Sequence, residues 1–474
     1  MLTVPLFING RDVTTSKTID VTSPSTGQVI HRAAAAGVAD AIAAVEAAQA
    51  AFPAWAATTP DAKRKIFYKA ADLLEARLEE AGKVEEAEIS ARPSFAGGFD
   101  VPNAIAGLRS VAGVIGSVWG SIPSLSNPKK EALVLKEPFG VILGVAPWNS
   151  PYILGLRSFS FAIAAGNTAV IKVSELAPQS MGILGQVFRD AGLPDGVLNI
   201  IQTHPSDAAA VTRAIIEHPA VRKINFTGSA VVGRIVAELA GKNLKPMLME
   251  LGGKAPAIVL PDADLELAAR ECAVGAFLHS GQICMATERI IVVKGITDKF
   301  AEVLKGTIEA IFPSKGDALV LISEAGVKKN KALVADAQRK GGEVIFGDVN
   351  AAEAAPVLMR PVVVKGVTKE MDIYYTESFG PTVSLIEVED EEAAIQLAND
   401  TEYGLSSSIF TRDLLAGLRV AKRIESGAVH INAMSVHDEP ALPHGGVKAS
   451  GWGRFGSQGI DEWYKTKTIT YMTS

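Results

Sequence analysis

Cysteine is scarce in this sequence, because its 474 residues include only Cys272 and Cys284. A disulfide framework or a cysteine-ligated metal centre requires several cysteines at characteristic spacings. The seven histidines are scattered along the chain and predict no metal cluster. Two unpaired thiols suit a reducing compartment, so we expect a cytoplasmic protein without a metal site.

The sequence also has no excess of basic residues. It contains 46 Lys and Arg and 52 Asp and Glu, which gives a formal net charge of -6 at pH 7. Such a chain has no general attraction for phosphates, so no nucleic acid partner is predicted. The most apolar region, 139–173, is interrupted by Pro147, Asn149 and Arg157. A membrane helix requires about 20 apolar residues in a row, so no membrane partner is predicted. The N-terminus shows no basic region followed by an apolar core, and we expect no secretory signal.

The length of the chain exceeds what one hydrophobic core supports, so two or three domains are expected. Strand-like apolar runs alternate with helical segments in two series. The predicted strands are 141–146, 169–173, 197–201, 221–226 and 246–250 in the first series, and 257–260, 289–293, 343–346 and 382–386 in the second. This alternation is typical of parallel sheets covered by helices on both faces. We predict an α/β protein with two doubly wound α/β domains, whose ligands bind at the carboxyl ends of the strands.

Residues 119–136 form a short, polar, strand-prone segment that looks like an excursion from the compact body. It is either an arm that pairs with another subunit or an ordinary surface hairpin. Upstream of it, alanine-rich and helix-periodic sequences predict helices over 39–51 and 61–81. The pair Gly252-Gly253 lies between the two series and is a candidate hinge.

Cys284 lies in a small, polar stretch, 279–288, after a predicted apolar helix over 264–279. Ser280 and Gly281 form a bend just before it. A thiolate is a strong nucleophile when a nearby base or backbone donors support it. Cys284 is therefore a candidate nucleophile, and the alternative is a buried cysteine that acts as a small hydrophobe.

Two polar side chains follow predicted strands. Asn149 comes after the strand 141–146 and before a helix with Ser150 at its N-cap and Pro151 at its first position. Its neutral amide can donate a hydrogen bond to an oxyanion, although asparagine is also common in turns. Glu250 ends its strand, where a carboxylate in a partly apolar site serves as a general base or forms a cap or salt bridge.

Other strand ends are suited to a dinucleotide. Lys172 and Glu175 can reach ribose hydroxyls, and a carboxylate there repels a 2′-phosphate, which favours NAD over NADP. A surface ion pair is the alternative for these two residues. The turn 227–229 and the helix amides after it can hold a phosphate, or the glycine is merely structural. Glu377, at a glycine-proline turn, is placed to bind the other ribose.

With these residues together, the chain resembles the aldehyde dehydrogenase superfamily from about Phe7 to Thr468. The motifs that carry the resemblance occur in the family's order: Pro147-Trp148-Asn149, 172–175, Phe226-Thr227-Gly228-Ser229 with Gly233, 250–254, 281–284, 377–381, and Gly445-Gly446 with Lys448 and Ser450-Gly451. Seven motifs in register are far more specific than any single one.

The resemblance implies a mechanism in which Cys284 attacks an aldehyde carbonyl. Asn149 and the backbone N–H of Cys284 would hold the oxyanion, and Glu250 would activate water to hydrolyse the thioester. NAD would accept the hydride, with NADP the less favoured cofactor. The cofactor-binding residues implied are Ala146, Pro147, Trp148, Lys172, Ser174, Glu175, Gly228, Ser229, Gly233, Leu251, Glu377 and Phe379.

The resemblance also implies how the chain is divided. Residues 1–116 and 138–250 would form the NAD-binding domain, 251–443 the catalytic domain, and 444–462 a C-terminal return segment. Residues 117–137 and 463–474 would form an oligomerisation arm, in a homodimer or a dimer of dimers. The loop 203–206 lacks a glycine common in the family, and 313–326 lacks the usual Gly-Pro element.

Arg157 departs from the family most informatively, because many members carry a large aromatic eight residues after the catalytic asparagine. Positions 149, 153 and 157 share one helical face, so Arg157 is expected in the substrate tunnel. A buried guanidinium needs a partner, which is either a group on the substrate or a structural acid in the tunnel. Together with Tyr152, Ile283 and Met285, Arg157 predicts an aromatic aldehyde with a polar ring substituent.

This pattern is similar to the salicylaldehyde, vanillin and benzaldehyde dehydrogenase branch. Three alternatives stay open at this point. One is an aliphatic semialdehyde, such as succinic semialdehyde, whose carboxylate pairs with Arg157. The others are a cofactor-independent hydrolase that uses Cys284 and a non-catalytic descendant of an enzyme.

Overall fold

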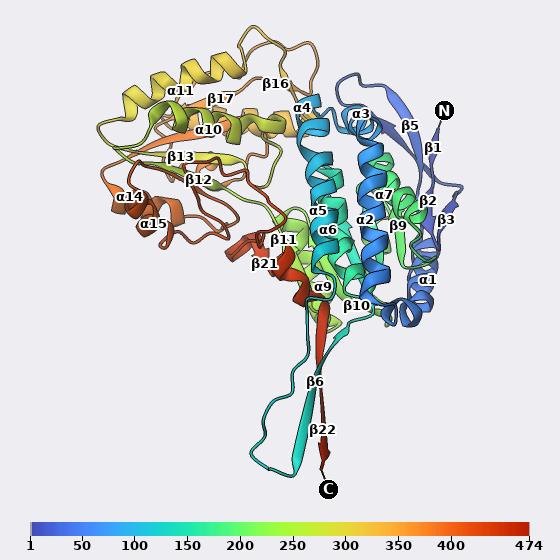
Figure 1. Ribbon diagram of the computed structural model, residues 1–474. Helices are drawn as coiled ribbons and strands as arrows, with labels where there is room; N and C mark the ends of the chain where they lie inside the picture. The colour runs from blue at the N-terminus through green and yellow to red at the C-terminus, as the bar shows by residue number, and fades with distance from the viewer. Residues whose placement is uncertain (1, 474) are drawn as a thin grey trace.

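The computed structural model describes residues 2–473, without the side chain of residue 458. Two α/β bodies lie side by side, and a long two-stranded arm projects from them (Figure 1). This confirms the predicted class of two α/β domains with an added β segment.

The first body is built on an eight-stranded sheet with the order β21-β11-β10-β7-β8-β9-β2-β3. Its five central strands are parallel: β7 (Val141–Ala146), β8 (Thr168–Val173), β9 (Leu198–Gln202), β10 (Val221–Thr227) and β11 (Met247–Glu250). They match the predicted strands to within one residue at each end. Short antiparallel strands close the edges: β2 (Leu6–Ile8), β3 (Arg11–Val13) and β21 (Gly451–Trp452).

Both faces of this sheet are covered, because alternate strand residues enter different apolar clusters. Ile142 packs into the cluster that includes residues of helices α2 (Pro60–Ala76), α5 (Val101–Val114), α6 (Pro151–Ala164) and α7 (Pro178–Ala191). Val141 and Leu143 pack into the cluster of α1 (Val38–Ala56), α8 (Ala208–Glu217) and α9 (Ala230–Lys242). The apolar runs seen in the sequence are therefore those of strands buried on both sides.

The helix predicted over 61–81 is in fact two helices. The first, α2, ends at Ala76, and α3 (Leu78–Ile89) begins after Arg77, whose φ of -106° and ψ of 14° break the helix. The guanidinium of Arg77 is held by Glu80 and Gln186. A turn, α4 (Pro93–Phe95), and a π-helix, η1 (Ala96–Asp100), then lead into α5.

The second body has a seven-stranded sheet with the order β15-β17-β18-β13-β12-β19-β20. Its strands are β12 (Ala255–Val259), β13 (Thr287–Val293), β15 (Glu343–Phe346), β17 (Val362–Lys365), β18 (Thr382–Val388), β19 (Ser408–Phe410) and β20 (His430–Ile431), with β15 antiparallel. The helices are α10 (Leu265–Phe277), α11 (Thr297–Ile311), α12 (Glu324–Arg339), α13 (Asp372–Tyr375), α14 (Glu391–Asn399) and α15 (Leu414–Ala421). All seven residues of β13 are buried, as expected for a central strand.

The arm consists of β6 (Lys130–Pro138) and β22 (Tyr464–Met472), paired antiparallel over nine residues (Figure 1). The predicted strand-prone segment thus contains a strand, β6, and its partner β22 belongs to the C-terminal segment that the resemblance grouped with it. The alternative of an ordinary surface hairpin does not describe this pairing. The remaining elements are β1 (Thr3–Val4), β4 (Thr18–Thr22), β5 (Val29–Ala34), β14 (Leu319–Val320), β16 (Leu358–Met359), η2 (Leu278–Gly281), η3 (Lys448–Ser450) and η4 (Ser457–Trp463). Within residues 2–473, no helix has both the length and the apolar character needed to cross a membrane.

Candidate active site

The carboxyl ends of β7 and β11 bring two predicted site residues to one edge of the first sheet. Both strands pair with β10 in parallel, and Thr227 of β10 lies opposite Glu250. Glu250 is the last residue of β11, and Asn149 follows β7 by three residues. The parallel register therefore brings the carboxylate and the amide to the same edge from positions 101 residues apart in the printed sequence.

Cys284 reaches this edge from the second body through a strained bend. His279, Ser280 and Gly281 have φ values of 48°, 60° and 73°, a left-handed conformation that side chains other than glycine rarely adopt. A Cβ on Gly281 would lie 2.3 Å from the carbonyl oxygen of Gly380, so glycine is required there. The predicted bend is thus confirmed, but it is rigidly held rather than flexible.

Hydrogen bonds fix Gln282, two residues before the thiol. The Gln282 side-chain oxygen accepts a hydrogen bond of 2.8 Å from the Ile322 amide. The Asn149 side-chain amide donates to the Gln282 carbonyl oxygen at 3.0 Å. A side-chain amide carries two N–H groups, so Asn149 contacts the segment before Cys284 with one of them, and the other is a further donor.

The helix behind Asn149 begins in an unexpected way. Ser150 occupies the N-cap of α6, as predicted, but its hydroxyl donates to Asp100 at 2.5 Å instead of capping the helix. The Asp100 carboxylate accepts from the amides of Tyr152 and Ile153, both at 3.0 Å. Asp100 is therefore the capping group, and burial raises its pKa to about 6 despite these hydrogen bonds.

Glu250 and Cys284 influence each other's chemistry. Burial raises the pKa of the Cys284 thiol well above its usual value, and the charge of Glu250 and its hydrogen bond to the thiol raise it further. Arg157 acts in the opposite direction. The thiol is therefore protonated at neutral pH, and a base must take its proton as it attacks. Glu250 is in place for that task.

Arg157 is buried beside Glu250, but protein groups satisfy its charge. Its guanidinium forms an ion pair with Asp438 and lies 3.5 Å from a Glu250 oxygen. Its Cζ is 5.2 Å from the centre of the Phe455 ring, a cation–π contact. The structural ion pair with an acid is thus what the structure shows, and direct contact with substrate stays a prediction.

A cavity lies next to this ion pair, between α5, α6 and the segment after β20. Its walls include Asn103, Ile153, Leu156, Arg157, Asp438, Leu442, His444 and Phe455. Ile153 and Arg157 share the predicted helical face and both line the cavity. Asp438, His444 and Asn103 were not predicted, because they belong to none of the quoted motifs; the one signal was that His444 directly precedes Gly445-Gly446.

The prediction that Tyr152 lines the tunnel is wrong. Its side chain is wholly buried in the core of the first body, and its hydroxyl donates to the Ala81 carbonyl oxygen at 3.0 Å. Ile283 and Met285 flank Cys284 and pack in an apolar cluster with Phe99 and Trp148. Their role as tunnel walls stays a prediction.

The turn after β10 has the form expected of a phosphate site. Ser229 is the N-cap of α9, and its hydroxyl accepts from the Val232 amide at 3.4 Å. A Cβ on Gly233 would lie 2.7 Å from the Leu251 side chain, so glycine lets the first turn of α9 approach the end of β11. The helix amides consequently face the same sheet edge as Glu250.

Lys172 and Glu175 lie at the end of β8, one strand from β7. Burial lowers the pKa of the half-buried Lys172 ammonium, and the charge of Glu175 opposes this effect. Ala146 is the last residue of β7, and Pro147 and Trp148 follow it. Ser174 follows β8 at the same edge of the sheet.

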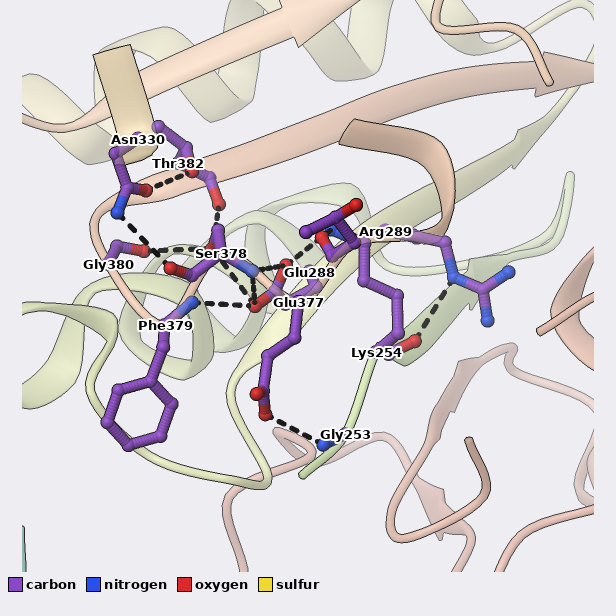
Figure 2. A network of polar contacts seen from close by, with 11 residues as sticks. Gly253, Lys254, Glu288, Arg289, Asn330, Glu377, Ser378, Phe379, Gly380 and Thr382 are labelled. Atoms are coloured by element: carbon purple, nitrogen blue, oxygen red, sulfur yellow. Dashed lines mark hydrogen bonds and ion pairs between the residues drawn. The ribbon is translucent and has the colours of Figure 1, made fainter. Parts of the chain in front are cut away.

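Glu377 and Phe379 are held by a buried polar network (Figure 2). The Glu377 carboxylate accepts from the Gly253 amide at 2.8 Å, and a Cβ on Gly252 would lie 2.7 Å from the same oxygen. Gly252 therefore makes room for Glu377. Gly253 makes room for the backbone of Cys284, since a Cβ there would lie 2.3 Å from the Cys284 carbonyl oxygen; the sequence did not reveal either contact. Burial and then the charge of Glu288 raise the pKa of Glu377 to about 7.

Glu288 organises this loop, although no role was predicted for it. It pairs with the buried Lys254 at 2.5 Å and accepts from the Ser378 amide at 2.8 Å (Figure 2). Phe379 has a φ of 49°, and its ring meets Trp148 edge to face at 6.1 Å between centroids. The network presents Glu377 and Phe379 opposite the strand ends of the first sheet.

Comparison with known proteins agrees with this geometry. The family model described as "Aldehyde dehydrogenase family" matches residues 12–469. The chain belongs to the aldehyde dehydrogenase family. The seven motifs that carry the resemblance therefore belong to a family of oxidoreductases.

This aldehyde dehydrogenase is 44% identical to a vanillin dehydrogenase of Pseudomonas fluorescens, over 99% of this chain and 98% of the relative. It is 37% identical to a salicylaldehyde dehydrogenase of Pseudomonas sp. (strain C18), over 98% and 97%. A crystal structure of a salicylaldehyde dehydrogenase from Pseudomonas putida G7 complexed with salicylaldehyde has a TM-score of 0.95 at 35% identity, and the match covers 100% of this chain and 98% of that chain.

Aldehyde dehydrogenases use a nicotinamide dinucleotide, and the residues at this edge fit one. The N-terminus of α9 suits the pyrophosphate, because the amides of its first turn that the Ser229 cap does not use can donate to an anion. The half-buried ammonium of Lys172 and the carboxylates of Glu175 and Glu377 suit ribose hydroxyls. Glycines at 228, 233, 252 and 253 keep the backbone close to this edge.

Proposed function

We propose that this aldehyde dehydrogenase oxidises an aromatic aldehyde with a polar ring substituent, of the salicylaldehyde, vanillin or benzaldehyde type, to the acid. One observation carries the proposal: the cavity beside Glu250 has apolar walls, including Ile153 and Leu156, and a polar corner made by Arg157, Asp438 and His444. Such a cavity matches an aromatic ring with one polar group. The printed names of the relatives support the same substrate class.

In the first half of the proposed reaction, the Cys284 sulfur forms a bond to the aldehyde carbon while Glu250 takes the thiol proton. The free N–H of the Asn149 amide and the Cys284 backbone N–H donate to the oxyanion. The nicotinamide, when bound, accepts a hydride from this carbon. A thioester on Cys284 is the result.

In the second half, water adds to the thioester carbon and Glu250 takes one of its protons. The C–S bond then breaks, the carboxylic acid leaves, and the electron pair of the bond stays on the Cys284 sulfur.

We propose NAD as the cofactor in preference to NADP. Glu175 follows β8 where the adenine ribose is expected, and its carboxylate would repel a 2′-phosphate. The half-buried Lys172 beside it would bind the ribose hydroxyls.

The alternative substrate, an aliphatic semialdehyde, requires Arg157 to bind a carboxylate. That guanidinium already has Asp438 and Glu250 as partners, and a third carboxylate would bring excess negative charge into a buried site. The hydrolase alternative requires a base such as histidine on Cys284, whereas the charged groups that act on this thiol are Glu250, Arg157 and Glu377.

A substrate panel tests the proposal. The purified enzyme is given salicylaldehyde, vanillin, benzaldehyde and succinic semialdehyde, each with NAD or NADP, and reduced nicotinamide is followed by absorbance. We expect kcat/KM to be highest for a substituted benzaldehyde with NAD, and a Cys284→Ala control to be inactive. A preference for succinic semialdehyde would refute the aromatic assignment, and a preference for NADP would refute the role of Glu175.

We also propose the domain limits and the oligomer expected from the sequence, with 117–137 and 463–474 forming the oligomerisation arm of a homodimer or dimer of dimers. The support is that β22 is exposed along nearly its whole length, including Ile469, Tyr471 and Met472, so a second subunit has apolar surface to cover. A catalytic thiol must stay reduced, which supports a cytoplasmic location.

A further inference from the structure

Glu250 must both gain and lose protons during the proposed reaction. It takes up a proton in each half of the proposed reaction and must lose it before it can act again. Yet its side chain is wholly buried, and its Oε1 accepts no hydrogen bond within residues 2–473. A buried carboxylate needs a neighbouring group that accepts its proton and also meets solvent.

Two side chains other than Cys284 flank the second carboxylate oxygen. Arg157 Nη1 is 3.5 Å from Oε2, but a guanidinium stays protonated and cannot accept a proton. His444 Nε2 is 3.9 Å from the same oxygen, a separation that a small ring movement reduces to hydrogen-bond length. His444 is therefore the flanking group that can accept a proton from Glu250.

The surroundings of His444 suit this role. Its Nε2 is buried and has no hydrogen-bond partner in the part of the chain that the structure describes. The side chain lines the cavity, so its ring also reaches solvent there. Its backbone is fixed by two hydrogen bonds with Phe455, of 3.0 and 2.7 Å.

The charged groups around the imidazole come from four segments. Burial lowers the pKa of His444, and Arg157 of α6 and Arg454 of the C-terminal segment lower it as well. Asp438 and Glu250 act in the opposite direction. The imidazole is therefore neutral at pH 7 and free to accept a proton.

We propose that His444 relays protons from Glu250 to the solvent of the cavity. After water has added to the thioester, protonated Glu250 passes its proton to Nε2 of His444, and the imidazolium then releases a proton to water. Glu250 is thereby restored as a carboxylate, and no electrons move. The inference rests on the proposed function, because it requires an acyl group on Cys284 that Glu250 helps to hydrolyse.

The acyl step can be examined without cofactor. An activated ester, 4-nitrophenyl acetate, can acylate Cys284 directly, so the burst of 4-nitrophenol reports acylation and the later steady rate reports hydrolysis of the thioester. His444→Gln removes the imidazole, which is the group that titrates. His444→Phe also removes it but keeps an aromatic ring in the cavity wall. His437→Gln is the matched control, since that histidine is exposed and lies outside the cavity.

We expect both His444 variants to keep the burst and to lose about tenfold or more of the steady rate, within the usual range for proton transfer by a positioned side chain. Added imidazole should restore the rate of His444→Gln. In the wild type, the steady rate should fall as the pH drops through the lowered pKa of His444, and this limb should vanish in both variants but not in His437→Gln.

An unchanged steady rate and pH profile in both His444 variants would overturn the relay. A loss of burst and steady rate together, without rescue by imidazole, would also overturn it and assign His444 to the cavity wall. If the wild type hydrolyses the ester with this dependence on His444 but oxidises no aromatic aldehyde, the substrate proposal fails and the relay stands.

Discussion

At the scale of single residues, the site contains a chain of ionic contacts between two buried side chains and the half-buried Asp438. Asp438, Arg157 and Glu250 form a chain in which one guanidinium lies between two carboxylates. Burial opposes ionisation of Asp438, but the charge and the hydrogen bond of Arg157 act against it, and the pKa of Asp438 lies below its usual value. Arg157 thus forms an ion pair with Asp438 and also lies beside Glu250, the proposed base.

Replacing Asp438 by Asn should destabilise the protein. The change leaves Arg157 with a single acidic partner, and breaking a buried pair costs about 3 kcal/mol or more. We expect a lower free energy of unfolding in urea at pH 7. Because the pKa of Asp438 is depressed in the folded state, the difference from wild type should shrink as the pH falls through that pKa.

The double variant Arg157→Gln/Asp438→Asn is the control for this pair. It should be more stable than Asp438→Asn alone, because no unpaired guanidinium remains buried. Equal stability of Asp438→Asn and the wild type, at matched protein concentration, would contradict this account of the ion pair.

At the scale of elements, the start of α6 matters most, because Asn149 immediately precedes it. Asp100 reaches that start from the π-helix η1, which is an extra-wide turn and often marks a functional position. The capping carboxylate therefore connects a segment 50 residues away with the oxyanion donor.

The raised pKa of Asp100 predicts a dependence of stability on pH. The folded state holds the proton up to about pH 6, whereas an unfolded aspartate loses it near pH 3.8. Stability should therefore fall as the pH rises from about 4 to about 6, by an amount on the order of 3 kcal/mol.

Asp100→Asn keeps an acceptor for the helix amides but cannot titrate. Unfolding of both proteins should be measured in urea at pH 4, 5, 6 and 7. The variant should gain stability relative to wild type between pH 4 and 6 and show no further relative change above that. A constant difference across the series would show that Asp100 does not titrate in this range.

The elements also show what sequence reasoning can reach. Strands β7 to β11 were predicted to within a residue, because runs such as 141–146 are apolar on both faces and end in clear breaks. Asn149 and Glu250 could be found for the same reason, since strand order and parallel register place them together.

Contacts between distant segments were beyond such reasoning. Asp438 and His444 belong to a loop whose sequence shows no periodic hydrophobic pattern. Which side chains they contact is decided only when the two bodies pack together. The error at Tyr152 has a geometric cause: the helix begins at Pro151, so Tyr152 lies about 100° around the axis from Ile153, which faces the cavity.

At the scale of the whole molecule, the arm is the part with the least burial of its own. Strand β22 is exposed over eight of its nine residues, whereas its partner β6 has two exposed, six half-buried and one buried residue. An isolated two-stranded ribbon is marginally stable in water, so contact with another subunit would explain its length.

A chain that ends at Trp463 should form smaller assemblies than the full-length enzyme. The buried Trp463 and its contact with Asn167 are retained, so each subunit should still fold. Sedimentation velocity of both chains at the same concentration gives the mass, and Thr466→Ala in the arm is the control. An unchanged mass for the shortened chain would refute the role of the arm in association.

The left-handed bend at His279, Ser280 and Gly281 has a consequence for how this enzyme can change. Two of its three residues adopt a backbone conformation that costs each about 1–2 kcal/mol, and surrounding contacts must supply that energy. Substitutions that let these residues adopt ordinary backbone angles would raise the stability of the fold. They would also let the Cys284 sulfur move away from Asn149 and Glu250. The stability of the fold and the reactivity of the Cys284 thiol are therefore opposed at this bend. Selection for higher stability is expected to lower the activity, and selection for activity is expected to lower the stability.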